Sequence, residues 1–124
     1  MKSERLTIFK TIKPLLKRYQ PPLVARSDYE GRYELWSEKE VIIDGRKRKD
    51  VFFASLIIQS NYVGFYFMPV YTDKDIKRLF AIQLLKLLKG KSCFHIKHID
   101  SDLMQAIDHT LDQGFDLYKQ RGWV

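Results

Sequence analysis

Cysteine is almost absent from this chain, since Cys93 alone occurs among 124 residues. A single thiol cannot form an internal disulfide, so nothing requires an oxidising compartment and we expect a cytoplasmic protein. Long apolar runs are also missing, because no uncharged stretch approaches the roughly 20 residues of a membrane-spanning helix. The first residues lead into a lysine-punctuated amphipathic segment and not into an apolar core with a cleavage site. This pattern argues against a secretion signal.

Motifs that would identify an enzyme are lacking as well. The chain has no glycine-rich phosphate loop, no nucleophile elbow and no carboxylate pair in an identifiable cleft. An active site can still assemble in space, so the enzyme question stays open while a non-enzymatic binding module is the leading hypothesis. None of these patterns calls for a cofactor, and none distinguishes a monomer from a homodimer.

Apolar and aromatic residues are plentiful, at 45% and 14% of the chain. This is enough to close one core without metal or disulfide at the commonest size of a domain. No repeat, low-complexity tract or linker divides the chain, so we predict one domain over residues 1–124.

The periodicity of the apolar residues predicts an α+β fold with an antiparallel sheet of about five strands, flanked by N-terminal, middle and C-terminal helices. Pro14 should kink or split the first helix. The second helix, with Thr72 at its start, should form one or two pieces. The element order is α-β-β-β-β-α-β-α, with helices over about 4–19, 72–90 and 101–121 and strands over about 32–38, 41–43, 51–58, 62–68 and 92–96.

Two features of the predicted sheet bear on function. Asp44-Gly45 is a hairpin signal, from which we expect residues 41–43 to lie beside the strand 51–58. That strand is apolar on both faces, which predicts a central strand covered on both sides. The aromatic strand 62–68 superficially resembles that of an RNA-recognition motif, but its rings are assigned mostly to the core.

Basic residues exceed acidic ones, with a net charge of +7 and a run Arg46-Lys47-Arg48-Lys49 near the predicted hairpin. This run could contact phosphates, although Glu38 and Glu40 could neutralise part of it across the hairpin. We therefore expect an anionic ligand or a protein partner, with nucleic acid as an alternative and Tyr62 as a further exposed ring. The predicted ligand-binding residues are Trp36, Arg46, Arg48, Tyr66, Lys91 and His95.

Two clusters contain metal-ligand residue types. Cys93 and His95 share one face of the predicted strand, but His98 has the opposite parity, which weakens a zinc site. Asp108, Asp112 and Asp116 recur every four residues and form one ridge of the last helix. This ridge could hold a cation or be an ordinary solvated face.

Several segments resemble the YdhG-like bacterial domain family: residues 35–39, 64–71, 88–97 and 118–123. The resemblance covers nearly the whole chain and implies an α+β fold whose antiparallel sheet is flanked by helices. One member of that family is described as a frataxin-like iron chaperone, a role that uses exposed acidic side chains. The resemblance therefore implies intracellular iron handling as an alternative function, with Asp108, Asp112 and Asp116, and with Asp100 and Asp102, as the candidate residues.

Overall fold

The computed structural model describes residues 2–124, apart from the side chains of Lys2, Ser3 and Lys74. η1 is a 3-10 helix, and the other helices are α-helical. The elements in chain order are α1 (Lys2–Lys17), β1 (Val24–Tyr29), β2 (Arg32–Ser37), β3 (Val41–Ile43), β4 (Arg46–Arg48), β5 (Val51–Ile58), β6 (Val63–Phe67), α2 (Met68–Thr72), η1 (Lys74–Leu79), α3 (Ile82–Leu85), β7 (Leu88–Lys89), β8 (Cys93–Ile96) and α4 (Ser101–Gln120).

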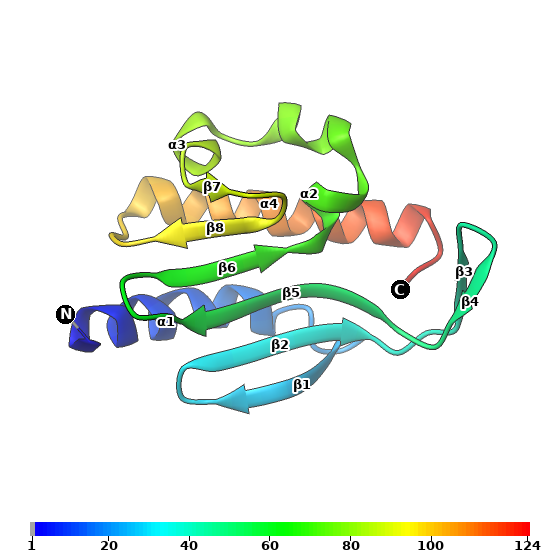
Figure 1. Ribbon diagram of the computed structural model, residues 1–124, viewed down its shortest axis with the longest axis horizontal. Coiled ribbons are helices and arrows are strands. Elements are labelled where there is room, and N and C mark those ends of the chain that lie inside the picture. The colour runs from blue at the N-terminus through cyan, green and yellow to red at the C-terminus, as the bar shows by residue number, and fades with distance from the viewer. Residues whose placement is uncertain (1) are drawn as a thin grey trace.

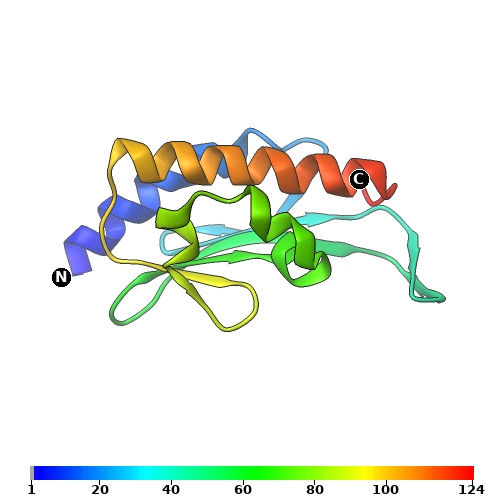
Figure 2. The same ribbon diagram turned by 90° about the horizontal axis from the view of Figure 1, so that it is seen from above.

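Six strands form one antiparallel sheet in the order β1-β2-β5-β6-β8-β7. Figure 1 views this sheet with α1 and α4 behind it, and Figure 2 shows both helices on the same face. The predicted α+β class and antiparallel sheet with N-terminal, middle and C-terminal helices are confirmed. The sheet has six strands where we expected about five.

The covered face of the sheet holds the core. Strand residues of one parity, such as Tyr33, Leu35 and Phe65, are fully buried there. The apolar stripes predicted for the first and last helices pack on these strand residues, because burying an apolar stripe removes it from water and stabilises the fold. The buried helix residues are Ile8, Phe9, Ile12, Leu16, Leu103, Ala106, Ile107, Thr110, Leu111, Gly114 and Tyr118.

The first and the middle helices depart in detail from the prediction. α1 continues through Pro14 to Lys17, so the predicted split is wrong. Pro14 is exposed, and water can satisfy the carbonyl that loses its partner. The middle helix breaks into α2, η1 and α3, and Asp73 caps η1 in place of the expected Thr72. Each short piece still contributes buried apolar residues to the core.

The predicted pairing of residues 41–43 with 51–58 is wrong. β3 pairs with β4 in a separate two-stranded sheet, and β5 pairs with β2 and β6. Asp44 and Gly45 have φ of 52° and 78°, which fits a two-residue turn that places β4 directly opposite β3. We call residues 41–49 the arm; it extends past one end of the sheet in Figure 1.

β5 is the central strand that we predicted, third in the order of six. The expected cover on both sides is wrong, because no helix of the described residues lies on the face opposite α1 and α4 (Figure 2). We call this the open face. Phe52 and Ile57 are only half-buried there. The open face makes apolar and aromatic strand residues available to a ligand.

Candidate functional site

Alternate residues of four neighbouring strands point to the open face. Trp36 lies opposite Phe52, and their ring centroids are 5.3 Å apart. Tyr66 lies between Ser55 and Cys93, and His95 lies opposite Gly64. Three of the six predicted ligand-binding residues, Trp36, Tyr66 and His95, therefore share one face.

The ring of Tyr66 covers the backbone of Gly64. A Cβ at position 64 would come within 2.7 Å of that ring, so glycine allows this close approach. Gln59 donates a hydrogen bond of 3.0 Å to the Tyr66 hydroxyl and helps to hold the ring in place. Burial raises the pKa of Tyr66 and of the neighbouring Cys93 thiol, so both groups stay protonated near neutral pH.

His95 forms the centre of a basic cluster. Its ring stacks on Tyr62 with centroids 3.7 Å apart and planes 8° from parallel. The pKa of His95 is lowered, first by burial and then by the positive charges of Lys89 and Lys97. Both lysines are exposed, and neither forms an ion pair with a carboxylate of the described residues. We call Tyr62, Lys89, His95 and Lys97 the His95 cluster.

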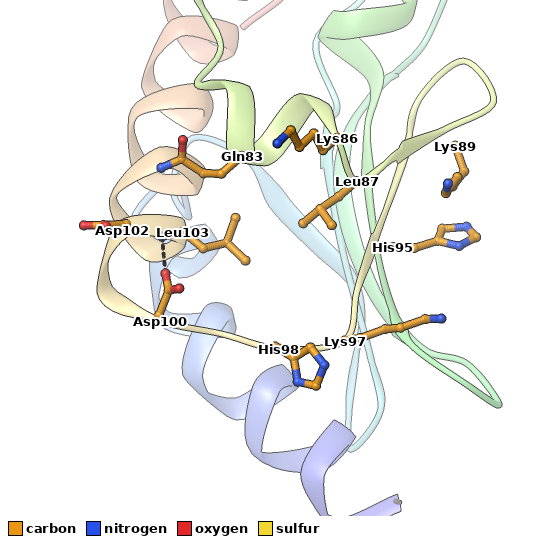
Figure 3. Close-up of a pocket in the computed structure, with 10 residues that line it drawn as sticks. All are labelled: Gln83, Lys86, Leu87, Lys89, His95, Lys97, His98, Asp100, Asp102 and Leu103. Carbon is orange, nitrogen blue, oxygen red and sulfur yellow. Dashed lines mark hydrogen bonds between the residues drawn. The ribbon is translucent and has the colours of Figure 1, made fainter.

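A hollow of about 640 Å³ adjoins this cluster at the edge of the sheet (Figure 3). In Figure 3 Lys89, His95 and Lys97 point to the side of β8 that faces away from Leu87 and Leu103. The titratable residues that line the hollow are Lys86, Lys89, His95, Lys97, His98, Asp100 and Asp102. The carboxylate of Asp100 accepts a hydrogen bond from the Leu103 amide, so it caps α4.

A second aromatic group lies near the other end of the open face. The guanidinium of Arg26 lies 4.5 Å from the centre of the Trp36 ring, in the range of a cation–π contact. Glu38 and Asp50 hold Arg26 there at 3.3 and 2.8 Å. We call Arg26, Trp36 and Phe52 the Trp36 cluster.

Glu34 is an acidic residue of the open face that contacts the Trp36 ring. Its carboxylate accepts hydrogen bonds of 2.9 Å from Trp36 Nε1 and from Arg32 Nε. Burial alone would raise the pKa of Glu34, but these hydrogen bonds and the charge of Arg32 outweigh it and lower that pKa. The charge of Glu34 is therefore largely neutralised within the protein.

Arg46 and Arg48 lie on the arm and not on the open face of the six-stranded sheet. All four basic residues of the arm are exposed, and none of them forms an ion pair with a described carboxylate. The expected neutralisation by Glu38 does not occur, because Glu38 pairs with Arg26. Lys91 lies at the turn between β7 and β8, 5.6 Å from the centre of the Tyr71 ring.

The acidic ridge of α4 is engaged by the two residues that follow α1. Arg18 forms ion pairs with Asp108 and Asp112, and the Tyr19 hydroxyl donates a hydrogen bond to Asp112. Asp116 lies apart, beside a separate hollow that includes Asp73 and Asp75.

The structure does not bring together the residues of either predicted metal-ligand cluster, Cys93 with His95 and His98 or the three aspartates of α4. His98 turns away from Cys93 and His95 and lies 3.6 Å from Glu4. Among the described residues, no three His, Cys, Asp or Glu side chains are close enough to hold a metal ion.

Sequence reasoning missed Arg26, Phe52, Lys89 and Lys97 as parts of these clusters. No residue of β1 is buried, so its sequence shows no strong apolar alternation, and β7 is only two residues long. If the pairing of β2 with β5 had been recognised, the alternation of side chains along residues 51–58 could have placed Phe52 on the same face as Trp36. Lys89 acquires its position only through its register with Cys93.

Fold and site together define an α+β protein with one layer of helices and one open, aromatic sheet face. No helix of residues 2–124 is long and apolar enough to cross a membrane. No family model, curated protein or solved structure matches the chain. The resemblance to the YdhG-like family therefore stays a prediction.

Proposed function

We propose that this protein is a non-enzymatic binding module for an anionic ligand, which binds at the His95 cluster. The observation that carries the proposal is that Lys89 and Lys97 flank the stacked His95 and Tyr62 rings without a carboxylate partner among the described residues. Two unpaired ammonium groups beside a half-buried ring attract an anion from more than one side. The single cysteine supports the further proposal that the protein acts in the cytoplasm.

The lowered pKa of His95 supports this location. Burial is the larger cause of this shift, but Lys89 and Lys97 also disfavour a third positive charge on the imidazole, so they contribute a positive potential at the ring. A bound anion would offset that potential and raise the pKa of His95. A binding role fits the face better than covalent catalysis, because burial raises the pKa of Cys93 and keeps its sulfur in the less nucleophilic thiol form.

Titration of the protein with inorganic pyrophosphate tests the proposal, with the ring resonances of His95 followed by NMR over a range of pH. We expect saturable shifts at Tyr62, His95 and Lys97, and a rise in the pKa of His95. Lys89→Gln with Lys97→Gln should weaken binding about 30-fold, since each of the two exposed charges contributes on the order of 1 kcal/mol.

The matched control is Lys10→Gln with Lys17→Gln, which removes the same charge from exposed positions of α1 on the other face. This control should bind pyrophosphate nearly as well as the unmodified protein. Equal loss in the two double variants would show a response to net charge alone and would overturn the proposed site.

A further inference from the structure

We infer that the anionic ligand is a single-stranded nucleic acid, which lies across the open face with its bases on the ring clusters and its phosphates against the lysines. This inference rests on the proposed function and names the class of ligand. It uses the rings of the open face and the charge of the arm, neither of which a small anion would need.

The two ring clusters suit planar bases. His95 and Tyr62 already stack nearly parallel, so the outer ring plane can accept a further aromatic group. The Arg26 guanidinium over Trp36 offers a second plane, since bases stack on arginine as well as on rings. Between the clusters, the Tyr66 ring covers Gly64 and continues the aromatic surface.

The spacing of the clusters calls for an extended ligand. His95, Gly64, Ile57 and Arg32 lie opposite one another in successive strands, so β8 and β2 are three strand spacings, or about 14 Å, apart. Trp36 lies four residues further along β2, or about 13 Å. Only a chain that carries several planar groups can contact both clusters at once.

The charges of the described residues complement such a chain. The arm, with four exposed basic residues, extends past one end of the sheet, and β8 with the His95 cluster runs toward the other end (Figure 1). Glu34, between them, is neutralised by Arg32. A duplex would present phosphates but no unstacked bases to this face. A single strand carries one planar base for every phosphate, a regular pairing that an acidic protein does not offer, so single strands fit best.

Fluorescence anisotropy with labelled oligouridylate and oligothymidylate of about 12 nucleotides tests the inference, at several salt concentrations. Binding should weaken steeply with salt and should be tighter than for a duplex of equal length. Arg46→Ser with Arg48→Ser should reduce the salt dependence by about one to two released ions. Tyr62→Leu should weaken binding about 10-fold, in the range for the loss of one stacked base.

Two control variants test whether the loss of the Tyr62 ring itself weakens binding. Tyr62→Phe retains the aromatic plane and should bind normally. Tyr71→Leu removes an exposed ring of α2, outside the six-stranded sheet, and should also bind normally. If a duplex or inorganic polyphosphate bound as tightly as the single strand, or if Tyr62→Leu had no effect, the inference would be wrong.

The outcomes also separate this inference from the proposed function. If oligonucleotides fail to bind while pyrophosphate still raises the pKa of His95, the nucleic-acid inference fails and the anion site stands. If neither probe moves His95 resonances, the proposed function itself fails.

Discussion

At the scale of the residue, Gly114 shows how tightly α4 packs on the sheet. An added Cβ would come 2.3 Å from Phe67 and 2.8 Å from Pro69, both of which are buried. Alanine favours a helix over glycine by about 1 kcal/mol, but an overpacked core typically loses about 1–3 kcal/mol. We expect Gly114→Ala to lower the free energy of unfolding by about 1–2 kcal/mol, measured by urea denaturation.

A double-mutant cycle provides the control for this prediction. Phe67→Leu shortens the side chain that the new methyl group would meet. The combination with Gly114→Ala should therefore be less destabilising than the sum of the two single changes. Strict additivity would mean that the close approach is not the cause.

At the scale of the element, Arg18 and Tyr19 join the chain after α1 to the acidic ridge of α4. Arg18 is about half exposed, so its ion pairs with Asp108 and Asp112 are screened by water. We expect Arg18→Ala to cost less than about 1 kcal/mol, and the cost should shrink in high salt.

Tyr19→Ala tests the same junction through packing. The Tyr19 ring contacts Phe53 and Phe115 and is almost fully buried, so its loss should cost about 3 kcal/mol with little dependence on salt. Urea denaturation at low and high salt compares the two variants. A larger cost for Arg18→Ala than for Tyr19→Ala would contradict this view of the junction.

At the scale of the whole molecule, tyrosines make the fold sensitive to alkaline pH. Burial raises the pKa of Tyr33 to about 12, and it also raises those of Tyr19 and Tyr118. The unfolded chain loses these protons near pH 10, at about the ordinary pKa of tyrosine, and so binds fewer protons than the folded chain above that pH. Stability should thus be unaffected below about pH 9 and fall as the pH rises from about 10 to 12.

Denaturation midpoints across this pH range, with tyrosinate absorbance, would measure the effect. Tyr118→Phe should be less stable at neutral pH, because the Phe52 carbonyl loses a 2.6 Å hydrogen bond, but it should lose less stability on alkalinisation. Tyr71→Phe, at an exposed position, should change neither property. If the denaturation midpoint did not change from pH 9 to 12, the buried tyrosines would not be the cause of an alkaline loss of stability.

The success of the sequence-based prediction depended on periodicity. The first and last helices and the central strand were predictable because their apolar residues repeat over many positions. β1 was not predictable, because it is an edge strand with polar side chains that is stabilised by its pairing with β2. Its sequence therefore shows little apolar periodicity. The prediction that residues 41–43 pair with β5 failed because β3 pairs with β4 inside the arm. β5 pairs instead with β2.

The candidate site was predictable only in part, for the same reason. His95, Tyr66 and Trp36 could be identified as candidates from the sequence. Lys89, Lys97 and Arg26 join them only through strand order and a register shift in β1. Glu38 was expected opposite the arm, and it pairs instead with Arg26.

The sequence by itself determined the α+β class, the single apolar core and the basic character of the chain, since these follow from composition and local periodicity. Only the tertiary structure decided that both long helices cover the same face and that the other face carries rings and lysines without a carboxylate partner among the described residues. The physical reason is that strand order and helix placement depend on contacts between distant residues, which no local pattern records.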